Sequence, residues 1–177
     1  LNYSTTAETI TVSDAGSGQT TVDSDVGGET ITFNNPTGTL TINAGDTGAN
    51  IVDVEALAAS YSASITINGG NGSDTVNLNG DVSLASGQSL MINADAVNTS
   101  AGVELATSGA GTITITADDV ALNATSTLTS AGAVTVAPQT ASRGIRLGAE
   151  TAGQLSLTDV ELDRISAASL LIGNAMA

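Results

Sequence analysis

Residues 65–80 read ITINGGNGSDTVNLNG, and the first five of them recur in altered form along the chain. Two close copies, each 25 residues away, are LTINA at 40–44 and LMINA at 90–94. More distant copies are ITITA at 113–117 and VTVAP at 134–138. Each copy alternates apolar and polar residues, which is typical of a strand with one buried face. Repeats this short cannot bury an apolar face alone, so they are expected to stack on one another.

The glycine-rich corners and the strands after them recur as well. The segment IVDV at 51–54 aligns with TVNL at 75–78, so each repeat holds a second strand. Near the start, ETITV at 8–12 recurs after 21 residues as ETITF at 29–33. Stacking of repeats of 21–25 residues predicts an all-β right-handed parallel β-helix, or β-solenoid, with one repeat per turn.

Two further observations bear on this fold prediction. Stacked repeats would place Leu40, Ile65, Leu90 and Ile113 above one another inside the molecule. Hydrophobic residues make up 41% of the chain but aromatic residues only 2%, which favours a narrow, regular interior. The alternative is a β-sandwich, which would need antiparallel hairpins and does not predict matching residues at fixed intervals.

An asparagine follows the inward-facing isoleucine in three repeats. Stacked asparagines can pass side-chain amide hydrogen bonds from one repeat to the next, and thereby satisfy groups that a turn leaves unpaired. We expect this ladder to be structural; its members are Asn43, Asn68 and Asn93.

The charge is strongly one-sided. Eighteen acidic residues face three arginines, and the formal net charge is −15. Nucleic-acid binding needs clustered basic residues, so this class of function is excluded. No apolar run approaches the roughly 20 residues of a transmembrane helix. The acidic surface indicates either affinity for divalent cations or a device that keeps a β-rich chain in solution.

The pattern changes at Arg143, since all three basic residues lie in the last part of the chain. We expect residues 1–142 to form regular solenoid coils, and residues 143–177 to form terminal coils of the same continuous domain. Thr158 and Glu161 have the spacing of a helix capping box, which predicts a short helix inserted there.

Residues 144–175, GIRLGAETAGQLSLTDVELDRISAASLLIGNA, resemble a segment of very large secreted bacterial proteins of the filamentous-haemagglutinin-like or adhesin-like kind. Residues 38–54 and 69–80 are similar to calcium-binding repeats of the repeats-in-toxin type. The resemblance covers most of residues 29–177. It implies a right-handed β-helix, a location outside the bacterial cell or on its surface, a role in adhesion or a biofilm matrix, and no enzymatic activity.

Residues 69–77 fit the nonapeptide G-G-x-G-x-D-x-U-x. By this resemblance Asp74 would bind calcium together with carbonyls of the Gly69–Gly72 loop. Asp46 aligns with Asn71, so a site built from Asp46, Asn50, Asn71 and Asp74 on adjacent coils stays possible. The next copy lies about 24 residues away instead of nine, and Asn50 stands where an aspartate is expected. The alternative is a plain corner in which the glycines permit a left-handed backbone and Asp74 caps the turn.

Two other acidic pairs, Asp118–Asp119 and Asp23/Asp25, are further candidates for calcium binding, but we interpret them as solvated edges. Calcium is therefore the one candidate cofactor. A catalytic role is not expected, because histidine and lysine are absent and the arginines sit at one end.

Two functions stay open. The first is a structural or adhesive module whose partner is a second copy of itself, stacked end to end into a filament. The motive is that a solenoid exposes unpaired strand edges unless they are capped, and the chain ends in the uncharged LLIGNAMA. The second is a spacer or receptor-binding segment of a giant adhesin, flanked by neighbouring repeats of its parent chain.

Overall fold

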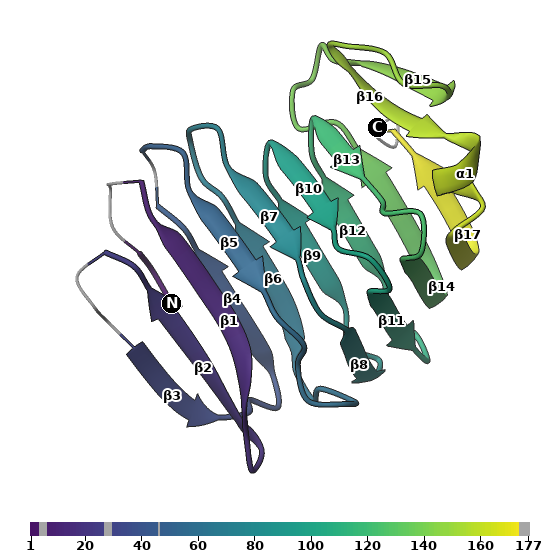
Figure 1. Cartoon of the computed structure of the whole chain (residues 1–177). Helices are drawn as coiled ribbons and strands as arrows, with labels where there is room; N and C mark the ends of the chain where they lie inside the picture. The colour runs from purple at the N-terminus through teal and green to yellow at the C-terminus, as the bar shows by residue number, and fades with distance from the viewer. Residues whose placement is uncertain (4–6, 27–29, 46, 174–177) are drawn as a thin grey trace.

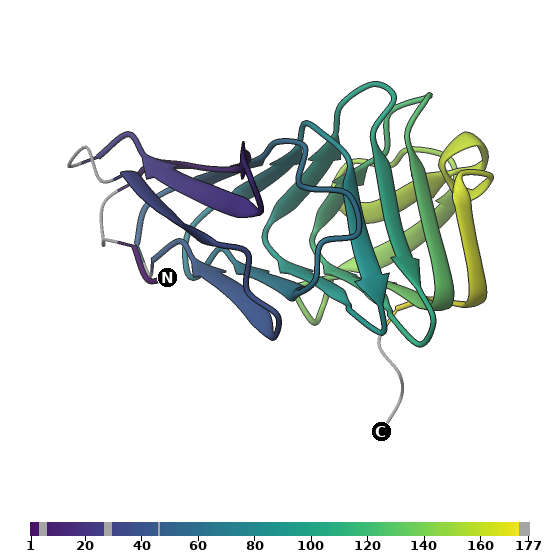
Figure 2. The ribbon, with the colours of Figure 1, turned by 90° about the horizontal axis from the view of Figure 1, so that it is seen from below.

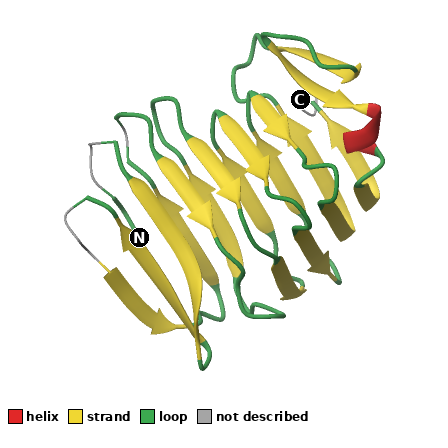
Figure 3. Ribbon diagram, in the orientation of Figure 1, coloured by secondary structure: helices red, strands yellow, loops and turns green. Residues whose placement is uncertain are grey.

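The computed structural model describes residues 1–3, 7–26, 30–45 and 47–173, and nearly all of its regular secondary structure is β-strand, joined by loops (Figures 1 and 3). Two large sheets and one small sheet hold these strands. In Figure 2 the strands follow one another along the molecule from the purple N-terminal end to the yellow C-terminal end. No helix within the described ranges is long and apolar enough to span a membrane.

The first large sheet has seven strands in the order β13-β10-β7-β5-β1-β2-β3. Its pairing is parallel from β13 to β1 and antiparallel from β1 through β2 to β3, so the sheet is mixed. Its strands are β1 (Thr9–Gly16), β2 (Gln19–Ser24), β3 (Thr30–Asn34), β5 (Ile51–Val54), β7 (Thr75–Leu78), β10 (Ala96–Thr99) and β13 (Asp119–Ala121).

The second large sheet is parallel, and its main path runs β4-β6-β9-β12-β14-β11-β8. The long strand β14 joins two parts of this sheet, because its first half pairs with β11 and its second half with β12. A further strand, β17, pairs with the other edge of β14. The strands are β4 (Thr39–Asn43), β6 (Ser64–Asn68), β8 (Val82–Ser86), β9 (Leu90–Asn93), β11 (Glu104–Ser108), β12 (Ile113–Thr116), β14 (Thr127–Ala137) and β17 (Ile165–Ile172).

A separate parallel pair, β15 (Gly144–Gly148) and β16 (Gln154–Thr158), lies near the C-terminal end. The short helix α1 (Asp159–Leu162) follows β16 directly, as the capping-box spacing predicts. Leu162 and Ile165 pack against the core from this flank.

The repeats pair in register where the sequence copies are closest. Leu40 lies beside Ile65, and Ile65 lies beside Leu90. Ile113 then pairs with Leu90 on one side and with Val134 on the other. The predicted stack of these apolar residues is confirmed, and all of them are buried in one core that draws on both large sheets.

The predicted fold class, a right-handed parallel β-helix of 21–25 residues per turn, is nevertheless wrong. The chain is mostly β, but its strands form a mixed sheet, a parallel sheet in which β14 joins two parts, and a separate two-stranded sheet. A uniform stack of coils accounts for none of these three features. The same correction applies to the β-helix that the family resemblance implies.

The N-terminal part shows the physical reason most clearly. The segments around 8–12 and 29–33 do not stack on each other, because β2 lies between β1 and β3 and runs antiparallel to both. The chain reverses at Gly16, Ser17 and Gly18, whose φ angles are 76°, 54° and 73°. Consecutive positive φ values form the tight hairpin turn whose twist matches that of the strands.

Candidate functional site

The predicted cation-binding residues are only partly brought together. Asn50 and Asp74 are buried and adjacent, at the starts of β5 and β7. Asn71 is exposed in the loop before β7. Asp46 lies outside the described residues. Within the described ranges, no three His, Cys, Asp or Glu side chains are grouped so that they could hold a metal ion. Calcium binding by this set stays a prediction.

Both side-chain groups of Asn50 form hydrogen bonds to other residues of the protein. Its backbone N–H and its Nδ2 both donate to Asp74 Oδ1, at 2.9 and 3.0 Å. Its Oδ1 accepts from the backbone N–H of Glu8 at 3.2 Å. Asn50 therefore points N–H donors, and not its side-chain oxygen, at Asp74. These hydrogen bonds link neighbouring repeats structurally.

The glycine loop closes over Asp74. A Cβ atom on Gly69 would lie 2.6 Å from Asp74 Cβ and 2.9 Å from its Oδ2. A Cβ atom on Gly72, whose φ is +141°, would lie 1.7 Å from the carbonyl oxygen of Gly48. The loop needs glycine at both positions because the backbone approaches its neighbours too closely for any side chain.

Asp74 belongs to a larger array that sequence reasoning missed. One acid or amide stands immediately before the first strand residue in five strands that pair in register. We call this array the acidic column; its members are Glu8, Asn50, Asp74, Asp95 and Asp118. The available signal was this fixed position before each strand, but the residue type varies among Glu, Asn and Asp.

The column works by capping backbone groups of neighbouring repeats. The N–H of Asp74 donates to Asp95 Oδ2 at 2.8 Å. At the C-terminal end of the column, Thr140 donates to Asp118 through its backbone N–H at 2.8 Å and through its hydroxyl at 2.5 Å. Arg143 adds an ion pair, with its Nη1 3.9 Å from Asp118 Oδ2. Asp118 is thus buried and paired, and its interpretation as a solvated edge is wrong.

Two members of the column differ in their electrostatics. Burial raises the pKa of Asp74, and the negative charge of Asp95 adds to this, against the hydrogen bonds from Asn50. Burial also acts to raise the pKa of Asp118, but the hydrogen bonds from Thr140 and the charge of Arg143 outweigh it and lower the pKa. Asp74 Oδ2 is buried and accepts no hydrogen bond from any described residue.

The asparagine ladder is present as predicted. Asn68 Nδ2 donates to Asn43 Oδ1, and Asn93 Nδ2 donates to Asn68 Oδ1, each at 2.8 Å. Asn2 extends it, because its Oδ1 accepts from Asn43 Nδ2 at 2.5 Å. A similar ladder on β5, β7 and β10 comprises Asp53, Asn77 and Asn98. These contacts satisfy amide groups along the sheets.

The predicted helix cap also forms. Thr158 Oγ1 accepts from the N–H of Glu161, and Glu161 Oε2 accepts from the N–H of Thr158 at 2.9 Å. Glu161 does more than cap α1, since its Oε1 accepts from the N–H of Leu122 at 2.9 Å. The carboxylate therefore ties α1 to the end of β13.

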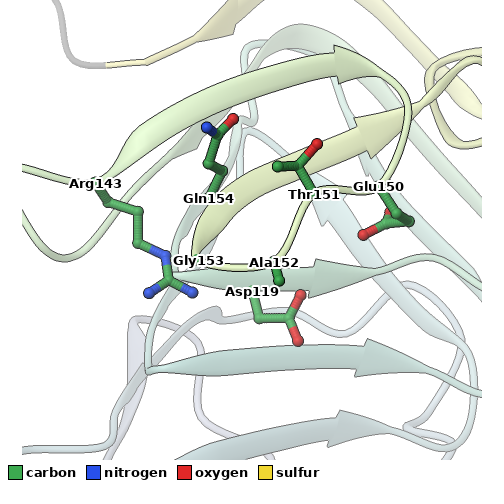
Figure 4. Close-up of a pocket in the computed structure, with 7 residues that line it drawn as sticks. All are labelled: Asp119, Arg143, Glu150, Thr151, Ala152, Gly153 and Gln154. Atoms are coloured by element: carbon green, nitrogen blue, oxygen red, sulfur yellow. The ribbon is translucent and has the colours of Figure 1, made fainter.

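A surface pocket of about 260 Å³ lies between β13 and the loop that joins β15 to β16. Figure 4 shows the side chains of Arg143, Asp119 and Glu150 around it; the remaining lining residues are Thr151, Ala152, Gly153 and Gln154. Partial desolvation, and then the charges of Glu161 and Asp119, raise the pKa of Glu150. The pocket offers hydrogen-bond donors and acceptors to a small polar molecule.

No protein-family model matches the chain, and no curated protein or solved structure matches it either.

Proposed function

We propose that this chain is a non-enzymatic structural or adhesive module that acts outside the cell and joins copies of itself end to end into a filament or matrix. The observation that carries the proposal is the exposure of the last residue in a file of apolar side chains that runs across the parallel sheet. The file starts at Leu40 in β4 and ends at Leu170 in β17.

The inner members of the file are covered by the repeats on either side of them. Ile65 and Leu90 are 3% and 2% exposed, and Ile113 and Val134 are fully buried, while Leu40 in the first strand of the file is 5% exposed. Leu170 pairs in register with Val134 and continues the file, yet it is 43% exposed. A further β-layer packed on β17 would cover Leu170 as each inner layer covers its neighbour.

The backbone of β17 is also suited to such a layer. Among the described residues β17 pairs with β14 alone, so its other edge holds unpaired N–H and C=O groups. None of its eight residues is charged. Natural edge strands are commonly protected by charges, prolines or bulges, and β17 carries no charge or proline.

We assign a second copy of the chain as the occupant, on the argument of charge. The chain carries a net charge of −15, so most faces of two copies repel each other. The edge strand β3 at the N-terminal end is uncharged, and its Ile31 is 40% exposed. Contact between two different ends is heterologous, and such contacts build open filaments when they do not close into a ring.

The location outside the cell is supported by the resemblance of most of residues 29–177 to secreted bacterial adhesin-like chains and calcium-binding repeats. That resemblance also supports the alternative, a spacer or receptor-binding segment of a giant adhesin with or without calcium. In that case neighbouring repeats of the parent chain would cover β17.

The test is light scattering after size-exclusion chromatography over a series of protein concentrations, in calcium and again in excess chelator. Two variants are compared, Leu170→Lys at the C-terminal end and Met91→Lys in the middle of the parallel sheet. Met91 is a matched control because it is 44% exposed and apolar but lies on an inner strand. Thermal unfolding of each variant checks that it is folded.

We expect the mass of the wild type to rise with concentration, Leu170→Lys to remain monomeric, and Met91→Lys to assemble like the wild type. Leu171→Lys, on the outward side of β17, should also block assembly without touching the file. A wild type that stays monomeric at every concentration contradicts the proposal and favours the spacer. Equal loss of assembly in Met91→Lys contradicts the assigned surface.

A further inference from the structure

Three asparagines of this chain are followed by glycine: Asn68, Asn71 and Asn79. An asparagine side chain can react with its own backbone when the next peptide nitrogen attacks the side-chain carbonyl carbon. Glycine at the next position favours this reaction because it has no Cβ to hinder the attack and allows a wide range of backbone angles. The three pairs share this chemistry, so their surroundings decide which of them reacts.

Asn68 is held on both sides of the reaction. Its Nδ2 donates to Asn43 and its Oδ1 accepts from Asn93, each at 2.8 Å. The nitrogen that would attack, that of Gly69, donates to the carbonyl of Asn93 at 2.8 Å. The side-chain amide cannot rotate toward this nitrogen without breaking the ladder.

Asn79 is held in a similar way at the end of β7. Its Nδ2 donates to Glu55 Oε1 at 3.1 Å, and its Oδ1 accepts from Ser100 Oγ at 3.0 Å. The N–H of Gly80 donates to the carbonyl of Val54 at 3.3 Å. Reaction at Asn79 therefore also requires a local opening of the structure.

Asn71 has none of these restraints. It is exposed in the loop between β6 and β7. No hydrogen bond joins its side-chain amide, or the N–H of Gly72, to any residue that the structure describes. In the folded protein, therefore, no hydrogen bond to a described residue has to break before the Gly72 nitrogen can attack the Asn71 side chain.

We propose that Asn71 is a site of self-catalysed modification, at which the folded protein converts one specific amide into an acid. The nitrogen of Gly72 loses its proton and bonds to the Asn71 Cγ, the Cγ–Nδ2 bond breaks, and the amide nitrogen leaves as ammonia. Water then opens the cyclic imide at either of its two carbonyls. The products are aspartate or isoaspartate, and no oxidant, reductant or enzyme is required.

The modification places a new negative charge on the loop that covers Asp74. The isoaspartate product also adds one backbone carbon beside Gly72, where the chain already packs tightly against the carbonyl of Gly48. The loop therefore changes with the age of the protein, whereas Asn68 at the end of β6 and Asn79 directly after β7 keep their side-chain hydrogen bonds.

The experiment incubates the folded chain at mildly alkaline pH and follows all three sites by peptide mapping and mass spectrometry, with isoaspartyl methyltransferase labelling to detect isoaspartate. A parallel sample is incubated in denaturant. An opening cost of about 1.4 kcal/mol slows a reaction about tenfold. We therefore expect Asn71 to react at least about tenfold faster than Asn68 and Asn79 in the folded chain, and at a similar rate in the denatured one.

Two variants sharpen the test. Asn71→Gln should remove the modification of this loop, since the longer side chain does not form the five-membered ring readily. The double variant Glu55→Ala/Ser100→Ala removes both partners of the Asn79 side chain, and it should speed the reaction at Asn79 while leaving Asn71 unchanged. Equal rates at the three sites of the folded chain, or no reaction at Asn71, would overturn the proposal.

Discussion

At Asp74, one carboxylate oxygen accepts two hydrogen bonds from Asn50 and the other accepts none from any described residue. Its position in the acidic column explains why this carboxylate is buried although one of its oxygens accepts no hydrogen bond within the described ranges. The column supplies caps to backbone N–H groups of adjacent repeats, and in doing so it brings Asp74 and Asp95 close together. Asp118 is also buried in the column, but there hydrogen bonds from Thr140 and the positive charge of Arg143 offset the cost of burying the carboxylate.

Asp74 therefore predicts an unusual dependence of stability on pH. Its pKa in the folded chain lies above the ordinary value of 3.8. Between 3.8 and the raised pKa the folded chain binds more protons than the unfolded one, so the free energy of unfolding falls as the pH rises through this interval. Asp118 acts in the opposite sense, since its lowered pKa stabilises the fold above 3.8 and this contribution is lost as the pH falls through the lowered pKa.

We expect Asp74→Asn to be more stable than the wild type at neutral pH by about 1 kcal/mol, and to show no advantage well below pH 3.8, where Asp74 is protonated in both states. Chemical denaturation at several pH values measures this difference. Asp163→Asn, at an exposed aspartate, is the control and should leave the difference from the wild type independent of pH. A destabilised Asp74→Asn at neutral pH would show that the charged form is preferred.

At the scale of single elements, strands and ladders were predictable because they follow from short patterns. The alternation in β4, β6 and β9 predicts buried files, and the asparagine after each buried isoleucine predicts the ladder. The helix α1 follows from its capping box. These features depend on residues close in sequence or at matching positions in neighbouring repeats.

Other elements could not be predicted from the same patterns. The sequence of residues 8–12 recurs at 29–33, at the spacing expected for two stacked repeats. In the structure the chain instead turns back at Gly16–Gly18, and β2 pairs between β1 and β3. The strand β14 pairs with β11, β12 and β17, and the number of its partner strands could not be predicted from its sequence. The acidic column was not predicted because its members share a position before a strand but differ in residue type.

The asparagine ladder carries its own prediction. Asn68→Ala removes the bond to Asn43 and leaves Asn93 Nδ2 without its acceptor. Because an unsatisfied, partly buried amide costs more than a lost contact, we expect a loss of about 1–3 kcal/mol in the free energy of unfolding. Asn34→Ala, in the edge strand β3, is the matched control and should cost less than about 0.5 kcal/mol. Equal losses would mean that the ladder adds nothing beyond an ordinary side chain.

At the scale of the whole molecule, the net charge of −15 opposes the contact of uncharged ends that we propose. Added salt screens repulsion between exposed charges and strengthens apolar contacts only weakly at moderate concentration. We therefore expect wild-type assembly to increase from low to moderate salt, measured by light scattering. Leu170→Lys should remain monomeric throughout. Assemblies that dissolve as salt is added would indicate ion pairs between copies instead of apolar contacts.

The in-register pairing of the repeats also bears on how the molecule forms. Along β4, β6, β9, β12 and β14, partners such as Leu40 and Ile65 are separated by only 21 to 25 residues of chain. Closing loops of this length carries a modest entropic cost, and that cost is nearly the same at every step. The central strands can therefore zip together one after another, each newly paired strand serving as the template for the next.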